Sequence, residues 1–232
     1  MEKISVVVPT YNERENLPML MEGLRSVIGD YGLEIIIVDD CSPDGTGEVA
    51  EQLSRKYGNV KVIHREGKKG LASAVIEGFN CAGEDILGVI DADMQHPPEN
   101  ICRMLKEIHN GADIVIASRY VKGGGVESWS ERRKLISKVA SLLARLVFPK
   151  IRNIKDPVSG FFLLKRATLK GASINSIGFK ILLEILAKGT YDKVVEVPYV
   201  FRERKKGRSK LSFKEYYDYL RHVFRLAKST RV

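Results

Sequence analysis

Three short polar clusters follow candidate strands, and their side chains could bind a charged ligand. Pro9-Thr10-Tyr11-Asn12-Glu13 follows the first apolar run, Asp39-Asp40 the second, and Asp91-Ala92-Asp93-Met94-Gln95-His96 the fourth. A single carboxylate at such a position is commonly a helix cap or a turn residue. Three clusters at one sheet edge are hard to explain by capping alone, because open parallel sheets bind ligands beyond the carboxyl ends of their strands.

Asp91 and Asp93 form the sharpest of these features. Two carboxylates two residues apart after a strand can face one hard cation, and Gln95 can add a neutral oxygen. Oxygen ligands that leave coordination positions open suit Mg²⁺ or Mn²⁺ shared with a diphosphate. A lone Asp-x-Asp also occurs by chance, but this position at a strand end favours a metal site at Asp91, Asp93 and Gln95.

The second half of the chain supplies cations for such a diphosphate. Arg119 follows the fifth candidate strand, Arg132-Arg133-Lys134 opens a helical stretch, and a basic, glycine-containing segment runs over 202–210. Arginine binds phosphate oxygens through two parallel hydrogen bonds, while lysine acts as a point charge. Charge alone leaves the 202–210 segment open between a solvated loop and a mobile one, and we favour a loop that closes over phosphate.

Alternating apolar runs and amphipathic stretches predict the elements that position these residues. In the first half the candidate strands are Ile4–Val8, Glu34–Val38, Val60–His64, Ile86–Ile90 and Asp113–Ala117, and the candidate helices are Asn16–Ile28, Thr46–Tyr57, Leu71–Cys81 and Pro98–His109. Runs that are apolar throughout are typical of strands covered on both faces. We therefore expect an α/β fold with a mostly parallel central sheet and helices on both faces.

After Ser118 this alternation stops. The candidate elements that follow are a helix at Ser130–Phe148, a strand at Val158–Leu164, a helix at Phe179–Lys188, a strand at Val194–Phe201 and a helix at Phe213–Lys228. No linker and no internal repeat marks a boundary. We expect one domain over residues 1–232, with a change of character between 1–118 and 119–232.

Net charge changes at nearly the same place. The 232 residues are 44% apolar and 29% charged, with a formal charge of +9. Residues 1–116 hold 11 Lys and Arg against 20 Asp and Glu, a net charge of −9, whereas 117–232 hold 27 against 9, a net charge of +18. The basic half is expected to meet something anionic: nucleic acid, phosphorylated ligands or a membrane face.

Several classes of protein are excluded. The apolar content argues against disorder, the apolar stretches are too short to span a bilayer, and the first residues carry no export signal. Cys41, Cys81 and Cys102 form no Cys-x-x-Cys pair, which indicates a reduced, cytosolic protein. A P-loop, a Gly-x-Gly-x-x-Gly after the first strand and a nucleophile elbow are all missing from the sequence.

Four blocks of the sequence resemble the signatures of glycosyltransferase family 2. They are Pro9–Glu13, Val38-Asp39-Asp40, Asp91-Ala92-Asp93-Met94-Gln95-His96-Pro97-Pro98-Glu99 and Asp156-Pro157-Val158-Ser159-Gly160-Phe161. Within that family the chain is similar to the dolichyl-phosphate (polyprenyl-phosphate) mannose synthases, from about residue 3 to about residue 228. The combination of the long aspartate block, Ser118-Arg119-Tyr120 and the 156–161 block is far more specific than a lone Asp-x-Asp.

The resemblance implies a Rossmann-like GT-A fold with C-terminal amphipathic helices, a GDP-mannose donor and a dolichyl or polyprenyl phosphate acceptor. It makes 1–118 the nucleotide- and metal-binding half and 119–232 the acceptor-binding, membrane-facing half. The residues it places around GDP-mannose are Pro9, Tyr11, Glu13, Val38, Asp40, Asp91, Ala92, Asp93, Arg119, Arg204 and Lys210. It places the metal (Mg²⁺ or Mn²⁺) on Asp91, Asp93 and Gln95, and the acceptor phosphate on Arg119, Arg133 and Ser137, with Asp93, Arg119 and Arg133 as the catalytic residues.

The chemistry of a phosphate acceptor follows from its charge. A phosphate monoester has a second pKa of about 6, so it is largely dianionic at neutral pH and already nucleophilic. Attack opposite the leaving GDP inverts the anomeric carbon, and no general base is strictly required. Asp156 could take a proton from an alcohol acceptor, but we favour a positioning role for it. The arginines would screen the anionic acceptor from the anionic donor.

Two helical stretches carry apolar stripes beside basic residues. The stripes are Leu135, Ile136, Val139, Leu142, Leu143, Leu146 and Val147 in one, and Phe213, Tyr216, Tyr217, Leu220, Val223, Phe224 and Ala227 in the other. Core packing explains most such stripes, and an anionic interface is the alternative. We favour the interface for the first and leave both open for the second. The expected place is the cytoplasmic face of a membrane, reached directly or through a small membrane-anchoring subunit.

Other functions remain open at this stage. A polyprenyl-phosphate glucosyltransferase that uses UDP-glucose cannot be separated from a mannosyltransferase by the residues alone. A nucleic-acid-binding protein would show aromatic platforms or a recognition helix, and the lone Trp129 makes that function weak, so we expect no nucleic-acid partner. A silent sugar-nucleotide-binding module is disfavoured because Asp91, Asp93 and Arg119 are all present.

Overall fold

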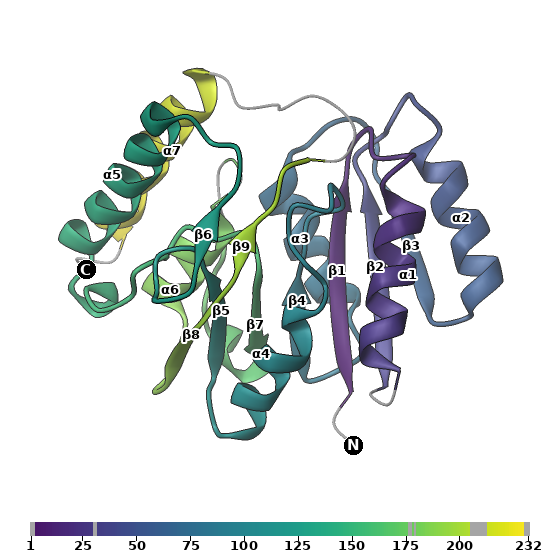
Figure 1. Ribbon diagram of the computed structural model, residues 1–232, viewed down its shortest axis with the longest axis horizontal. Helices are drawn as coiled ribbons and strands as arrows, with labels where there is room; N and C mark the ends of the chain where they lie inside the picture. The colour runs from purple at the N-terminus through teal and green to yellow at the C-terminus, as the bar shows by residue number, and fades with distance from the viewer. Residues whose placement is uncertain (1–2, 30–31, 176–177, 179, 205–212, 230–232) are drawn as a thin grey trace.

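Seven strands form the central sheet, in the order β3-β2-β1-β4-β7-β5-β8 (Figure 1). The strands are β1 (Ile4–Thr10), β2 (Leu33–Asp39), β3 (Val60–His64), β4 (Ile86–Val89), β5 (Ile114–Ser118), β7 (Phe162–Lys165) and β8 (Val194–Pro198). All pairs are parallel except those of β7, which runs antiparallel to β4 and β5. The computed structural model describes the chain apart from residues 1–2, 30–31, 176–177, 179, 205–212 and 230–232, and apart from the side chains of 213–216.

Helices cover both faces of this sheet, as the alternating pattern predicts. One core contains α1 (Leu17–Ile28), α2 (Thr46–Tyr57) and α4 (Asn100–His109), and the other contains α3 (Leu71–Cys81), α6 (Ile181–Lys188), and parts of α5 (Glu131–Val147) and α7 (Phe213–Ser229). Within β1, Val6 and Val8 belong to the first core and Val7 to the second. Because both faces are buried, the strands are apolar throughout.

The predicted strand at Val158–Leu164 begins later than expected. The residues just before β7 form a turn that contains Pro157 and Ser159. The Ser159 hydroxyl donates to the carbonyl of Ala117 at 2.8 Å. β7 starts only at Phe162, which lies opposite both Val89 and Ile116. Since β7 is antiparallel, the turn before it reaches the same sheet edge as the carboxyl ends of β4 and β5.

The predicted strand at Val194–Phe201 is divided in two. β8 ends at Pro198, and β9 (Val200–Phe201) pairs with β6 (Gly125–Val126), a strand that the pattern did not predict. Two 3-10 helices, η1 (Pro149–Ile151) and η2 (Arg166–Leu169), complete the described elements. Beyond β9 the chain reaches the loop after β4, where Arg202 N donates to the carbonyl of Gln95 at 2.9 Å.

Helices α5 and α7 lie side by side at one end of the molecule (Figure 1), and the Tyr219 hydroxyl on α7 donates to the carbonyl of Ala140 on α5 at 2.6 Å. Their inner residues Ala144, Val223 and Leu226 are buried. Their outer apolar residues are exposed by 43 to 70%: Leu135, Val139, Leu142, Leu146, Tyr217, Leu220 and Phe224. Phe213 and Tyr216 belong to the side chains outside the description. Among the described helices, none is long and apolar enough to cross a membrane.

Candidate active site

The carboxyl ends of β1, β2, β4 and β5 meet at one edge of the sheet, where the sequence predicted a ligand site. The loops after β1, β2 and β4 each contain a non-glycine residue in the left-handed region: Asn12 (φ 57°), Cys41 (φ 58°) and Met94 (φ 62°). This conformation costs non-glycine residues energy and persists where the surroundings enforce it, commonly at functional sites. The strain therefore coincides with the predicted clusters.

The loop after β4 brings Asp91 and Asp93 together. Asp91 Oδ2 lies 3.1 Å from Nε2 of the buried His96, and Asp93 Oδ1 accepts from the backbone N of Gln95 at 3.1 Å. Burial and the charge of Asp91 raise the pKa of Asp93, while His96 and Arg204 act in the opposite direction. Two carboxylates are thus held where they repel each other.

A divalent cation fits this arrangement, because it relieves the repulsion that the two carboxylates experience. Gln95 donates its Nε2 to the carbonyl of Arg202 at 3.1 Å, so its orientation is fixed. In the described part of the chain no group of three or more Asp, Glu, His or Cys side chains forms a metal cluster. A cation held by Asp91, Asp93 and Gln95 would have further coordination positions for a ligand, since Mg²⁺ prefers octahedral coordination.

Arg204 contacts Asp93, one of the predicted metal ligands, and lies near Glu13. Its NH2 lies 2.6 Å from Asp93 Oδ2, and its NH1 lies 3.8 Å from Oε1 of Glu13. The guanidinium neutralises these carboxylates, and a bound cation would compete with it for Asp93. Arg204, from the segment predicted to close over phosphate, therefore lies beside Asp93 in this structure, whereas Lys210 lies outside the described residues.

The loops after β1 and β2 form the side of the site predicted to hold a nucleoside. Lys68 Nζ lies 3.9 Å from the centroid of the Tyr11 ring. The buried Glu13 accepts from Asn16 Nδ2 at 2.8 Å. The side chains of Pro9, Val38 and Ala92 are buried, so any contact of these three predicted residues with a ligand would be made by the backbone.

Asp40 is held by a residue that sequence reasoning missed. Arg65, almost fully buried, donates its NH1 to Asp40 Oδ1 at 2.8 Å. The backbone N atoms of Lys69 and Gly70 also donate to this carboxylate, at 3.0 and 2.7 Å. Asp40 thereby fixes the loop before α3. No local signal distinguishes Arg65 from the surface arginines, because its partner lies 25 residues earlier in the chain.

Arg119 and Asp156 form a buried pair directly after β5. Arg119 Nε and NH2 donate to Asp156 Oδ2 and Oδ1 at 2.8 and 2.7 Å, and the backbone N of Arg119 donates to Oδ2 at 3.0 Å. Burial lowers the pKa of Arg119, but the charge and hydrogen bonds of Asp156 outweigh it and hold the pKa above its ordinary value. Glu196 in turn accepts from the backbone N of Asp156 at 2.9 Å.

Arg133 and Ser137 lie on the first turns of α5, beside Arg119. The Arg133 guanidinium stacks on Trp129 with Cζ 4.2 Å from the ring centroid, and Arg119 Cζ lies 5.6 Å from the same ring. The Tyr120 hydroxyl donates to Ser137 Oγ at 2.7 Å. The structure thus brings Arg119 and Arg133 together around Trp129, whose part the sequence did not reveal, and joins Ser137 to Arg119 through Tyr120, whose ring centroid lies 5.3 Å from Arg119 Cζ.

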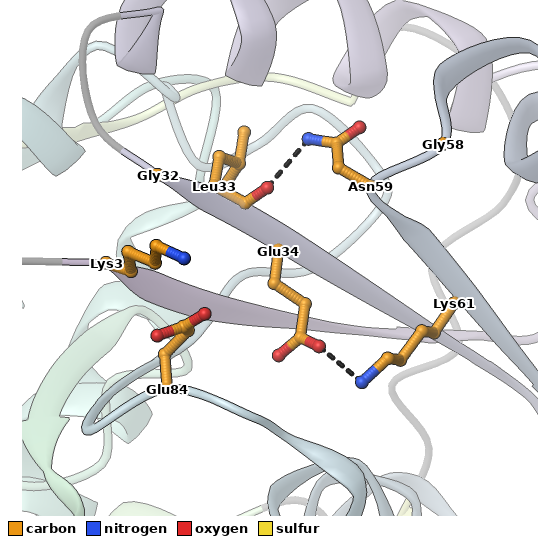
Figure 2. Close-up of a pocket in the computed structure, with 8 residues that line it drawn as sticks. All are labelled: Lys3, Gly32, Leu33, Glu34, Gly58, Asn59, Lys61 and Glu84. Carbon is orange, nitrogen blue, oxygen red and sulfur yellow. Dashed lines mark hydrogen bonds and ion pairs between the residues drawn. The ribbon is translucent and has the colours of Figure 1, made fainter.

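A separate surface pocket, drawn in Figure 2, lies where β1 to β4 begin, at the opposite end of these strands from the candidate site. Its lining residues are Lys3, Gly32, Leu33, Glu34, Gly58, Asn59, Lys61 and Glu84. Glu34 is already paired with Lys61 at 2.5 Å and accepts from the backbone N of Gly83 at 2.8 Å. These contacts lower the pKa of Glu34 against the opposing effect of burial. The charge of Glu34 is thus compensated within the pocket, and none of the site residues predicted from the sequence lines it, so the predicted edge remains the candidate site.

Comparison with known proteins identifies the family of the chain. The family model of glycosyl transferase family 2 matches residues 5–172. The dolichol-phosphate mannosyltransferase of Pyrococcus furiosus is 56% identical over 97% of the chain, and the chain spans 64% of that relative's length. The dolichol-phosphate mannosyltransferase of Saccharomyces cerevisiae is 37% identical over 94% of this chain and 85% of its own.

Solved structures share the fold. The glucosyl-3-phosphoglycerate synthase of Mycobacterium tuberculosis, in complex with Mn²⁺, UDP and glucosyl-3-phosphoglycerate, has a TM-score of 0.70 and 21% identity over 99% of this chain and 80% of its own. At that identity the likeness bears on architecture only. It agrees with the predicted GT-A fold: a mostly parallel sheet covered by helices.

Proposed function

The chain belongs to glycosyltransferase family 2, and we propose that it transfers mannose from GDP-mannose to a dolichyl or polyprenyl phosphate. The transfer inverts the anomeric carbon and yields a β-mannosyl phosphate. Relatives that match most of this chain are named dolichol-phosphate mannosyltransferases, which supports the sugar and the acceptor. The geometry of the site supports the reaction class independently.

The burial of Asp156 and its pairing with Arg119 are the observations that favour a phosphate over an alcohol as the acceptor. Both of its oxygens hold Arg119, and the residue is fully buried, so this carboxylate is not placed to take a proton from an alcohol. A phosphate dianion needs no such base, because it is already the nucleophile. Asp156 then acts by orienting Arg119, and the catalytic contacts come from Arg119 and Arg133.

The donor side follows from the acidic loop. Asp91, Asp93 and Gln95 would hold Mg²⁺ or Mn²⁺, which neutralises charge on the departing diphosphate. The structural relative from M. tuberculosis contains Mn²⁺, which supports a divalent metal here. Arg204, released from Asp93, can then bind the donor phosphates with its planar guanidinium. Tyr11, Glu13 and Asp40 surround the nucleoside.

Helix α5 links the acceptor phosphate to a lipid. Arg133 and Ser137 lie four residues apart in its first turns, where the helix dipole favours an anion. The same helix exposes Leu135, Val139 and Leu146 by 53 to 70%, beside the exposed residues of α7. An apolar face rimmed by lysine and arginine suits an anionic membrane surface. The helix can thereby receive the phosphate while its outer face contacts the lipid.

A transfer assay tests the proposed function. The purified protein is given radiolabelled GDP-mannose or UDP-glucose with a short prenyl phosphate, with and without Mn²⁺. We expect metal-dependent transfer from GDP-mannose, and no transfer to the matched prenyl alcohol. Transfer from UDP-glucose alone would replace mannose by glucose, and transfer to the alcohol would overturn the phosphate acceptor.

The membrane contact is tested separately. Leu146→Glu places a charge on the exposed face of α5 and is expected to reduce co-sedimentation with anionic phospholipid vesicles about tenfold. The same variant should transfer mannose to a short, water-soluble prenyl phosphate at the wild-type rate. Unchanged vesicle binding would show that this face does not meet the membrane.

A further inference from the structure

We infer that Lys180 is a third cation of the acceptor-phosphate site, beside Arg119 and Arg133, and that it binds the phosphate of the incoming acceptor. This inference rests on the proposed function for the identity of the acceptor. Lys180 belongs to neither the aspartate block nor the arginine clusters, and it directly precedes α6. Its hydrogen bond to the segment between Asp156 and Gly160, rather than its sequence context, connects it with the candidate site.

The backbone before β7 fixes the position of the Lys180 ammonium. Nζ donates to the carbonyl of Val158 at 3.0 Å. Val158 lies two residues after Asp156, the partner of Arg119. Val158 also lies two residues before Gly160, which is so close to the β4 loop that a Cβ atom on it would lie 3.3 Å from Asp91 Oδ2. The ammonium is thus anchored to the middle of a turn. One end of this turn holds Arg119, and the other lies against Asp91 in the loop after β4.

Four charged groups act on this ammonium. Burial is the main cause that lowers the pKa of Lys180 to about 7, and Arg119 and Arg133 lower it further, while Asp156 and Asp91 oppose them. The residue therefore lies within electrostatic reach of both the acceptor arginines and the metal-binding carboxylate. A dianionic phosphate between these cations would stabilise the ammonium form of Lys180 by direct charge attraction.

A dianion needs more positive charge than the buried pair provides. The charge of Arg119 is largely balanced by Asp156, which holds it through two short hydrogen bonds. A second and third cation are then required to offset the acceptor phosphate and to separate it from the donor diphosphate. Arg133 supplies one from α5, and Lys180 supplies the other from the start of α6.

Three substitutions separate this binding role from a structural one. Lys180→Gln keeps a donor for the Val158 carbonyl but removes the charge, and Lys180→Arg keeps the charge. Lys150→Gln is the matched control, because Lys150 Nζ also donates to a backbone carbonyl, that of Gly189 at 2.6 Å, away from the site. Trp129, the one tryptophan of the chain, stacks on Arg133, so its fluorescence can report phosphate binding without any sugar donor.

Farnesyl phosphate is titrated into each variant, and the KM values for acceptor and donor are then measured. We expect Lys180→Gln to weaken farnesyl phosphate binding about tenfold to a hundredfold and to raise the acceptor KM alone, with partial recovery in Lys180→Arg. Wild-type affinity in Lys180→Gln would overturn the inference and leave the proposed function intact. A wild-type protein that binds no farnesyl phosphate would overturn both.

Discussion

Two regions of opposite charge share one edge of the sheet, and they are built differently. The acidic region consists of loops that directly follow β1, β2 and β4, so Asp40, Asp91 and Asp93 lie one to four residues after a strand end. The basic region is assembled from distant segments. Arg119 follows β5, its partner Asp156 lies 37 residues later, and Arg133 stands on α5.

The difference shows how each kind of site is held in place. In the acidic region backbone N–H groups and two arginines hold the carboxylates: the buried Arg65 holds Asp40, and the partly exposed Arg204 holds Asp93. In the basic region long-range ion pairs and one aromatic ring fix the cations. We therefore expect substitutions in the first region to act mainly on ligand binding, and substitutions of the buried pair in the second to act on stability as well.

The largest expected effect is on the acidic side. Asp93→Ala removes a carboxylate from the predicted metal site, so metal-dependent binding of GDP-mannose should be lost and kcat/KM should fall by about a thousandfold. Isothermal titration with and without Mn²⁺ measures this loss. Glu22→Ala, which removes an exposed carboxylate on α1, serves as the control. If Asp93→Ala still bound GDP-mannose in a normal, metal-dependent way, the metal site would not lie in the acidic region.

The buried pair of the basic region provides the second test. Asp156→Ala leaves the guanidinium of Arg119 buried without its carboxylate, and the free energy of unfolding should fall by about 3–5 kcal/mol. Urea denaturation measures it. The double variant Arg119→Met/Asp156→Leu should recover part of this loss, because no unpaired charge remains buried. A fall of less than about 1 kcal/mol in the free energy of unfolding is typical of an exposed ion pair. Such a result would contradict the expectation that the buried pair of the basic region contributes to stability.

A smaller effect is expected for the cation on α5. Arg133→Ala should raise the KM for the prenyl phosphate about tenfold to a hundredfold and leave the KM for GDP-mannose unchanged. Arg132→Ala, at the exposed neighbouring position, is the control. Steady-state kinetics with each substrate varied in turn make the measurement. If the donor KM rose instead, Arg133 would belong to the donor side of the edge.

The smallest effect concerns the packing of α7. The buried His222 on α7 lies 3.9 Å from Glu184 on α6, and burial is the main cause that lowers its pKa. As the pH falls, His222 is therefore protonated in the unfolded chain before it is protonated in the folded protein. The contribution of neutral His222 to the free energy of unfolding is complete above pH about 6.5 and is lost as the pH falls below that value. Urea denaturation from pH 7.5 to 5.5 should show a steeper loss for the wild type than for His222→Gln. Equal slopes would exclude His222 as the cause.

Much of the acidic region could be predicted from the sequence. Short β-branched runs followed at once by Asp39-Asp40 or Asp91-x-Asp93 place these carboxylates at strand ends, because a strand and its loop are local in the chain. The sheet with helices on both faces was likewise predicted from alternating patterns. The apolar stripes of α5 and α7 were recognised, but only the structure divides each stripe into a packed side and an exposed side.

The basic region shows what the pattern could not supply. The start of β7 was placed too early, since the turn at 156–161 is apolar enough to resemble a strand. β6 was missed because two residues carry no periodic signal. Arg65, Trp129 and Lys180 act through partners far away in the sequence, and no spacing rule identifies such contacts.

The sequence by itself determined where the charged residues stand along the chain. Carboxylates follow the early strands, and arginines and lysines are concentrated after Ser118. Only the tertiary structure decided which cations meet which anions. The antiparallel β7 brings Asp156 to Arg119 and brings Gly160 to Asp91, and β9 carries Arg204 to Asp93. The physical reason is that local periodicity specifies elements, whereas the pairing of charges depends on how those elements pack.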